Sequence, residues 1–290
     1  MIRIGPAGWS YRDWEGVVYP VLKPKGFHEA TYLAQYFDTI EINTTFYRPP
    51  ERWIASNWVR RVGANPRFRF TAKLFRGFTH ERNATADDER QFKEGIAPLA
   101  EAGRLGALLL QFPWSCRNDE GNRAYLFDLF RRFRDFPLVL EMRHASWNQP
   151  AVRDVLAELG IGMCNIDQPL FARSITPSAH VTSPVGYIRL HGRNYQNWFT
   201  ENQQTGDRYN YLYTLDELEP WVERTKVIAK RAEDTYVVTN NHFLGKAIVN
   251  AFELVSLLFG QPVKPPKELR QHYPVLDQVS AEKPTQAPPR

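Results

Sequence analysis

Residues 39–49 (TIEINTTFYRP) constrain the fold more than any other part of the chain. The first five of them alternate, so that in an extended strand Ile40 and Ile42 point to one face, because successive strand side chains point to opposite faces. Glu41 and Asn43 then point to the other face. The same pattern recurs in strand after strand, with about the length of a helix between copies. We therefore predict that the polar faces converge on one lumen inside a ring of helices, which is a (β/α)8 barrel of the TIM type.

Seven further stretches have the length and composition of strands. Together with the first, the predicted strands cover residues 2–8, 39–43, 67–73, 105–112, 137–144, 161–167, 185–193 and 235–241. Helices are expected between them, over 28–37, 50–62, from 87 onward, and over 122–134, 216–232 and 244–259, whereas residues 170–182 show little helical periodicity. Eight strand-then-helix units, with no glycine-rich dinucleotide or Walker sequence after any strand, favour a closed barrel over an open sheet.

The length of 290 residues accommodates one barrel of about 250 residues and a tail. We predict a single barrel domain over residues 1–260, a proline-rich strap over 261–276 and a disordered tail over 277–290. These boundaries follow from the prolines that dominate the sequence after Gln261.

Composition limits the cellular environment and the partners. No apolar run reaches the roughly 18 residues of a membrane span, and the first residues lack a secretion signal, so we predict no membrane association. The two cysteines, Cys116 and Cys164, form neither a metal-binding spacing nor a disulfide framework, which favours a cytoplasmic location. A net charge of +5 favours anionic partners but is too small for a nucleic-acid-binding tail.

Charged residues gather at the carboxyl ends of the predicted strands, where barrel enzymes place their catalytic groups. Three acids and three bases dominate the set, and these could neutralise one another and serve only the fold. Burying ions is costly, however, so a lumen that keeps six of them favours a function. The predicted lumen residues are Glu41, Asn43, Lys73, Gln111, Glu141, Arg143, Asp167, Arg189, His191 and Asn241.

Two kinds of ligand fit these strand ends. A phosphate or carboxylate group of a substrate would be bound by the cations Lys73, Arg143, Arg189 and Arg193. The helix that begins near Gly245 adds a second anion-binding feature. A divalent metal would need acids and histidines on neighbouring strands, but the cations of the same ring compete for those carboxylates, so we predict no cofactor. If a divalent metal is bound, its ligands would be Glu41, Glu141, Asp167, His191 and His242.

Aromatic residues follow several of the predicted strands and form the rim of the lumen. Any one ring could simply fill the top of the barrel, but the set is typical of a platform on which sugar or base rings stack. The rim residues are Trp9, Tyr11, Trp14, Phe46, Tyr47, Trp114, Trp147 and Trp198.

Several motifs of this sequence together resemble those of a known family. They are GWSY at 8–11, EINTTFYR at 41–48, QFP at 111–113, EMRH at 141–144, RLHGR at 189–193 and NNH at 240–242. The set resembles the YecE-like family, also named domain of unknown function 72, over about residues 2–260. The resemblance implies a TIM-barrel fold, but it implies no activity and no catalytic residues. One departure is GPAGW at 5–9, where the family usually has threonine or cysteine and then serine between the two glycines.

We predict an enzyme that acts on a phosphate-bearing substrate with a ring, such as a sugar phosphate, a nucleotide or a nucleic-acid strand. Hydrolysis, isomerisation and elimination all remain open. Glu141 with His191 would transfer protons, with Glu41 and Asp167 as further catalytic candidates. Two alternatives are a non-catalytic module that binds single-stranded nucleic acid, and a divalent-metal-dependent phosphodiesterase or isomerase. Beside the cations, the substrate would contact Asn43, Gln111, Asn241, His242, Tyr47, Trp147 and Trp9.

Overall fold

The computed structural model describes residues 1–198 and 207–281. Within them, eight parallel strands pair in the order β1-β8-β7-β6-β5-β4-β3-β2. The ring is completed between β1 and β2, where Ala7 and Glu41 form a parallel bridge and the amide of Gly8 donates to the Glu41 carbonyl at 2.8 Å. The predicted barrel is therefore confirmed. Its strands are β1 (Ile2–Pro6), β2 (Thr39–Ile42), β3 (Arg69–Lys73), β4 (Leu105–Gln111), β5 (Leu138–Glu141), β6 (Gly162–Asp167), β7 (Val185–Leu190) and β8 (Asp234–Thr239).

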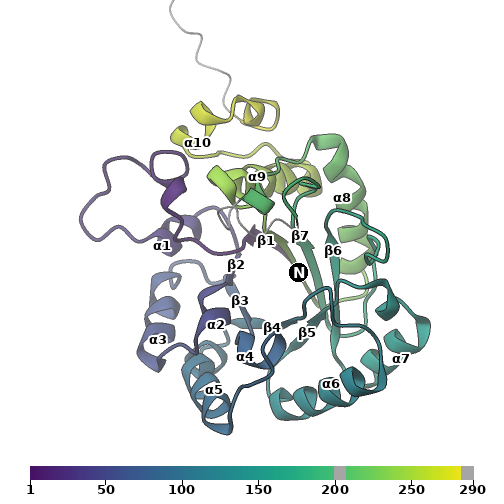
Figure 1. Ribbon diagram of the computed structural model, residues 1–290. Helices are drawn as coiled ribbons and strands as arrows, with labels where there is room; N and C mark the ends of the chain where they lie inside the picture. The colour runs from purple at the N-terminus through teal and green to yellow at the C-terminus, as the bar shows by residue number, and fades with distance from the viewer. Residues whose placement is uncertain (199–206, 282–290) are drawn as a thin grey trace, which may run out of the picture.

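Helices cover the outside of the strand ring, as Figure 1 shows. Residues 168–184, all of which the structure describes, contain no helix, so the prediction of a helix after every strand was wrong between β6 and β7. In the described part of the chain, no helix is both long and apolar enough to cross a membrane. The helices are α1 (Glu29–Leu33), α2 (Thr44–Tyr47), α3 (Arg52–Arg61), α4 (Arg76–Thr79), α5 (Ala86–Glu101), α6 (Glu120–Phe133), α7 (Pro150–Glu158), α8 (Leu215–Ala229), α9 (Lys246–Phe259) and α10 (Lys267–His272).

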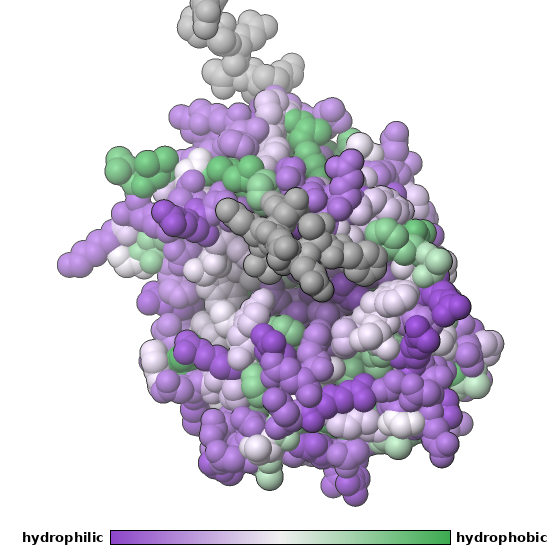
Figure 2. Space-filling model, viewed as in Figure 1, coloured by the Kyte–Doolittle hydropathy of each residue, from purple (hydrophilic) through white to green (hydrophobic). Residues whose placement is uncertain are grey.

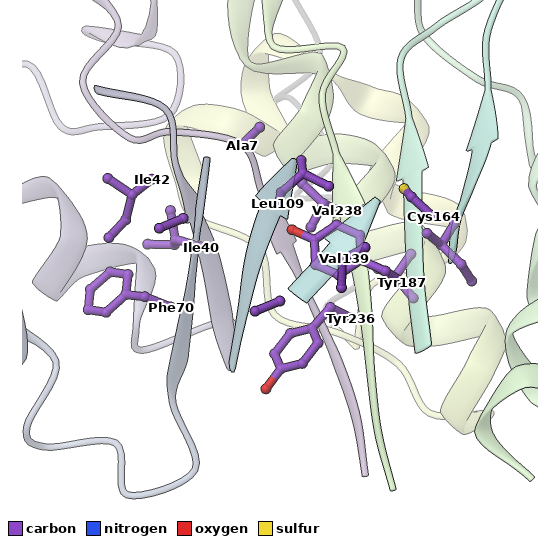
Figure 3. Close-up of a cluster of buried hydrophobic side chains, with 14 of the residues drawn as sticks. Ala7, Ile40, Ile42, Phe70, Leu109, Val139, Cys164, Tyr187, Tyr236 and Val238 are labelled. Atoms are coloured by element: carbon purple, nitrogen blue, oxygen red, sulfur yellow. The ribbon is translucent and has the colours of Figure 1, made fainter. Parts of the chain in front are cut away.

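Apolar and aromatic side chains fill the half of the lumen at the amino ends of the strands. Figure 3 shows Tyr187 and Tyr236 between the strands, with Leu109 and Val139 beside them, and all four are buried. Position 106 on β4 requires glycine, because a Cβ atom on Gly106 would collide with the Tyr236 hydroxyl group. Packing therefore closes this end of the barrel, and the carboxyl ends of the strands form the open end.

The proline-rich strap packs against the start of α9. Leu269 and Leu276 of the strap are fully buried, and the Tyr273 hydroxyl group donates to a backbone carbonyl just before α9 at 2.7 Å. Residues 277–281, which the sequence assigns to a disordered tail, are described in the structure, and Ser280 forms a parallel bridge with Val263 at the start of the strap. The rest of the predicted tail, 282–290, lies outside the described residues.

Candidate functional site

A buried network of charges crosses the lumen near the carboxyl ends of the strands. The Arg189 guanidinium group on β7 contacts two carboxylates, with Nη2 at 2.6 Å from Glu41 Oε1 and Nη1 at 2.6 Å from Glu141 Oε2. Arg143, just after β5, contacts Glu141 Oε1 through Nη2 at 3.0 Å. On the far side, the Tyr187 hydroxyl group lies 2.9 Å from Glu41 Oε2. The structure thus brings together the four charged residues that the sequence predicts for the lumen on β2, β5 and β7.

The charges of this network stabilise one another. Burial alone raises the pKa of a carboxyl group, but Arg189, His191 and Arg143 hold the pKa of Glu141 well below its usual value. Burial lowers the pKa of Arg189, and the two neighbouring carboxylates more than reverse this, so that its pKa lies well above the usual value. Glu141 is also fully buried. A carboxylate that stays ionised and has no access to the cavity is a poor general base.

His191 links the charged network to the residues above it. Its Nε2 atom lies 3.2 Å from Glu141 Oε1, and its Nδ1 atom lies 2.9 Å from Asn240 Nδ2. These contacts fit a neutral ring with its proton on Nε2, because the carboxylate accepts and the amide nitrogen donates. Burial lowers the pKa of His191 to about 3, and Arg143 and Arg189 act in the same direction against Glu141. At neutral pH, His191 is therefore an uncharged ring in a fixed position.

A cavity of about 1130 Å³ lies above this network, at the carboxyl ends of the strands. Figure 2 shows a hollow near the middle of this face, between mainly hydrophilic side chains. The walls come from the segments that follow β1, β2, β3, β4, β5, β6 and β8, together with residues near 198 and 208. The site therefore draws on nearly every strand end of the barrel, as barrel enzymes do.

The described residues that line the cavity include four cations and no carboxylate. The cations are Lys73, Arg76, Arg143 and Arg208. Arg143 contacts Glu141 in the buried charge network, which forms the floor of the cavity. Arg76 contacts Glu81 at the rim, at a distance of 2.6 Å. Lys73 differs from these two, because no described acid lies within ion-pair distance of its Nζ atom, which instead lies 4.2 Å from the centroid of the Phe46 ring.

Burial changes the protonation of the cavity's titratable side chains. It lowers the pKa of Lys73 to about 7, with Arg189 acting in the same direction. It lowers the pKa of His80 to about 4, with Lys73 as the next cause, and it lowers the pKa of His242 to about 4 as well. At neutral pH both histidines are uncharged, whereas Lys73 is divided between the amine and the ammonium form.

Two buried oxygen atoms of cavity-lining residues, Asn43 Oδ1 and Gln168 Oε1, have no donor among the described residues. The amide nitrogens fix the orientations. Gln168 Nε2 lies 3.4 Å from the Arg143 carbonyl, and Asn43 Nδ2 lies 3.4 Å from the Tyr11 hydroxyl oxygen, whose proton goes to the Ala7 carbonyl. An unpaired buried acceptor costs about 1–3 kcal/mol. Both oxygens therefore keep an acceptor position that no described residue fills.

Aromatic rings form much of the remaining wall. The His242 ring stacks on Tyr11, with the ring centroids 4.3 Å apart and the planes 13° apart, and lies 4.9 Å from Tyr209. Tyr47 is 62 % exposed and stands at the rim. Flat apolar walls of this kind suit a planar group. The aromatic lining residues are Trp9, Tyr11, Phe46, Tyr47, Trp58, Trp114, Trp198 and Tyr209.

Asp167 does not face the lumen, and the prediction that it does was wrong. Arg193, which was predicted to bind the substrate, contacts Asp167 outside the cavity. Asp167 accepts hydrogen bonds from Arg193 at 2.8 Å and from the indole N–H of Trp221, on α8, at 2.8 Å. Arg193 also contacts Glu217 of α8 at 3.2 Å. Figure 3 shows Cys164 among the buried residues of the lumen. Because side chains alternate along a strand, β6 turns Cys164 inward and Asp167 toward the helices.

Asn241 and Trp147 also point away from the cavity, contrary to prediction. Asn241 Nδ2 donates to Asn250 Oδ1 of α9 at 2.7 Å, and the preceding residue, Asn240, lines the cavity instead. The Trp147 indole N–H donates to the Cys116 carbonyl at 2.9 Å, in a buried position beside α6 and α7. The predicted substrate contacts that do line the cavity are Trp9, Asn43, Tyr47, Lys73, Gln111, Arg143 and His242.

The five residues predicted as metal ligands do not form one cluster, although His191 contacts Glu141. Arg189 lies between Glu41 and Glu141, Asp167 faces α8, and His242 stacks at the cavity wall. Within residues 1–198 and 207–281, no group of three or more histidine, cysteine, aspartate or glutamate side chains is placed to hold a metal ion.

Sequence reasoning missed several residues of the cavity. Arg76 and His80 come from the short segment after β3, and Gln168 directly follows β6. A systematic survey of the first residues after each strand would have found Arg76 and Gln168. No local pattern marks Arg208 or Tyr209, which lie far along the connection between β7 and α8.

Comparison with known proteins assigns the chain to a family. The family model described as a protein of unknown function, DUF72, matches residues 3–272. The chain belongs to this family. A DUF72 family protein from Thermotoga maritima is 31% identical, and the match covers 89% of this chain and 99% of that chain with a TM-score of 0.76. A DUF72 family protein from Enterococcus faecalis is 28% identical, with 89% of this chain and 96% of that chain covered and a TM-score of 0.75. None of the curated proteins compared with the chain matches it.

Proposed function

We propose that this protein is an enzyme that binds a phosphate-bearing small molecule with a ring in the cavity above the charged network. The charge of the walls carries this proposal. Four cationic side chains line the cavity, and no described lining residue is an acid. Guanidinium and ammonium groups are the usual partners of phosphate oxygens in proteins.

The floor of the cavity explains why positive charge remains available. Two carboxylates, Glu41 and Glu141, contact two guanidinium groups, those of Arg189 and Arg143, so the floor itself is balanced. Lys73 and Arg208 add positive charge, and no described lining residue is an acid that could neutralise it. An anionic ligand would supply the missing negative charge.

The walls indicate the rest of the ligand. Aromatic rings on several sides suit a planar ring or the apolar face of a sugar. The unpaired oxygens of Asn43 and Gln168 call for N–H or O–H donors on the ligand. A nucleotide or a sugar phosphate combines a phosphate group, a ring and such donors, and both are among the substrates that the sequence predicts.

The roles that we propose for the floor residues differ from those that the sequence suggests. Glu141 stays ionised and His191 stays neutral over the physiological pH range, so we assign both to positioning Arg143 and Asn240. Lys73 is the cavity side chain whose pKa, about 7, allows proton transfer at neutral pH. This group supports an enzyme over a passive binding module.

The proposal is tested by calorimetric titration of adenosine monophosphate and ribose 5-phosphate. Arg143→Gln should weaken binding about tenfold or more, because a charge-assisted contact to phosphate is lost. The matched control is Arg131→Gln on α6, whose side chain is 77% exposed, and it should bind like the wild type. Binding of neither compound, or equal affinity in Arg143→Gln, would contradict the proposal.

A titration with single-stranded oligothymidylate tests the alternative of a non-catalytic module that binds single-stranded nucleic acid. A small phosphate makes few ionic contacts, so its affinity should fall only gently with salt, whereas a bound strand gives a steep dependence. A salt-sensitive complex with the oligonucleotide, together with no affinity for the two small phosphates, would favour the nucleic-acid-binding module.

A further inference from the structure

Lys73 occupies a distinctive position in the cavity. It is the last residue of β3, and its side chain lines the cavity. The Thr45 hydroxyl group donates to the Lys73 carbonyl at 2.7 Å, which fixes the backbone at this point. Its Nζ atom lies over the Phe46 ring, at 4.2 Å from the centroid. An aromatic face and the cavity therefore surround the amine.

The acids that could hold Lys73 as an ammonium ion have other partners. Glu41 and Glu141 both contact Arg189, and Glu141 also contacts Arg143. A lysine that is desolvated beside other cations loses its proton readily and becomes a nucleophile. The lowered pKa of Lys73, caused by burial and then by Arg189, agrees with this geometry.

We propose that Lys73 is the nucleophile of the cavity and condenses with the aldehyde or ketone group of an anionic ligand. The inference rests on the proposed anion site, because arginines such as Arg143 would hold the anion and leave the amine free. The Nζ lone pair forms a C–N bond to the carbonyl carbon while the C=O π electrons move to oxygen. After proton transfer from nitrogen, the hydroxyl group takes up one proton from solvent and leaves as water. A protonated C=N bond results.

The condensation narrows the reaction class. A protonated C=N bond withdraws electrons from the neighbouring carbon, which eases the loss of a proton or the breaking of a C–C bond there. This electron withdrawal accelerates isomerisation and elimination, but it does not accelerate the hydrolysis of a phosphate ester. The substrate class is therefore a phosphorylated aldehyde or ketone.

Reductive trapping tests the inference. Pyridoxal 5′-phosphate combines a ring, an aldehyde and a phosphate, and sodium borohydride converts its imine into a stable secondary amine that peptide mapping locates. We expect one main adduct, on Lys73, that forms at least about tenfold faster than adducts on other lysines. Its rate should increase as the pH rises through 7, because the amine form increases.

Two variants serve as a matched pair. Lys73→Arg keeps the charge but cannot condense, so it should lose the main adduct. Lys246→Arg removes another lysine whose pKa burial lowers and whose Nζ atom lies 5.7 Å from an aromatic centroid, that of Phe243, but which does not line the cavity. This variant should be labelled like the wild type. Adducts spread evenly over several lysines, or equal labelling of Lys73→Arg, would overturn the inference.

Neutral pyridoxal and inorganic phosphate distinguish this inference from the proposed function. If neutral pyridoxal labels Lys73 as fast as its phosphate, and inorganic phosphate gives no protection, the reactive amine is supported and the phosphate site fails. If ribose 5-phosphate binds in an Arg143-dependent manner but the aldehyde does not label Lys73, the phosphate site is supported and the nucleophile fails.

Discussion

Two layers of charge lie one above the other at the open end of this barrel. In the floor, Arg189 is fully buried and contacts both Glu41 and Glu141, which are fully buried too. In the cavity, the described residues provide no acid partner for Lys73 and no donor for two amide oxygens of the walls. A paired layer is complete within the fold, because its charges compensate one another. An unpaired layer destabilises the fold unless a ligand completes it, so the difference separates structural charges from functional ones.

The largest expected effect is the loss of stability when a substitution disrupts the paired layer. Arg189→Met leaves two buried carboxylates with few remaining partners, so the free energy of unfolding should fall by about 3–5 kcal/mol in urea denaturation at pH 7. The control is Arg143→Met, whose side chain is 12% exposed at the cavity floor, and its loss should be less than half as large. A loss below about 1 kcal/mol for Arg189→Met would show that the floor network is not structural.

Glu253 on α9 shows what a buried carboxyl group does without a guanidinium partner. Asn250 Nδ2 donates to its Oε2 at 2.6 Å, and burial raises the pKa of Glu253 from 4.5 to about 7. Between these values the folded state binds more protons than the unfolded state. The free energy of unfolding should therefore decrease by about 3 kcal/mol as the pH rises from 4.5 to 7.

Urea denaturation of wild type and Glu253→Gln at pH 5 and pH 8 measures this difference. The glutamine keeps an acceptor for Asn250 and cannot ionise, so the variant should lose the decrease and be the more stable protein at pH 8. Parallel pH profiles for the two proteins would mean that Glu253 has the same pKa in the folded and unfolded states.

The fold was predictable because its strands carry a repeated signal. Glu41 alternates with two isoleucines on β2, and Arg143 and Glu141 share one side of the segment that contains β5, so the alternation sorts inward from outward residues. On β6 the same reasoning fails, although β2 and β5 are as fully buried as β6. The polar residues of β6 lie on the helix side, where Trp221 donates to Asp167, so polarity alone does not mark the lumen face of this strand.

The site was only partly predictable, and the reason lies in distance along the chain. Residues at strand ends, such as Lys73 and Arg143, are located by the strand pattern itself. Tyr209 and Arg208 reach the cavity from a long connection whose path no local pattern specifies. The protonation state of a residue is harder still to predict, because the ring of His191 is buried and contacts residues from two other strand ends, those of β5 and β8.

Lys73→Met tests the unpaired layer. The unfolded chain keeps the lysine proton up to a pKa near 10.5, whereas the folded protein releases it near 7. The unfolded state then binds more protons above pH 7, so the free energy of unfolding should rise by about 2 kcal/mol between pH 7 and pH 9, after allowance for the partial exposure of the side chain. Lys73→Met should lack this rise, and the surface variant Lys226→Met should retain it. Equal slopes in wild type and Lys73→Met would show that the amine is fully solvated.

The smallest effect concerns a single unpaired oxygen. Gln168→Met removes an acceptor that has no protein donor in the described structure, so its free energy of unfolding should stay within about 1 kcal/mol of the wild type. Its affinity for adenosine monophosphate should fall about three- to tenfold, the equivalent of one neutral hydrogen bond.

The contrast to Gln168 is Asn165, whose Oδ1 accepts from the His180 amide at 2.7 Å and from the Ser178 hydroxyl group at 2.8 Å. Asn165→Leu leaves both donors unpaired, so it should lose about 1–3 kcal/mol of stability and bind the nucleotide like the wild type. Urea denaturation measures the stability of each of the two variants, and calorimetry measures the affinity of each for adenosine monophosphate. Similar losses of stability in both would mean that the Gln168 oxygen belongs to the fold, and the argument from unpaired cavity groups to a ligand would lose one of its two amides.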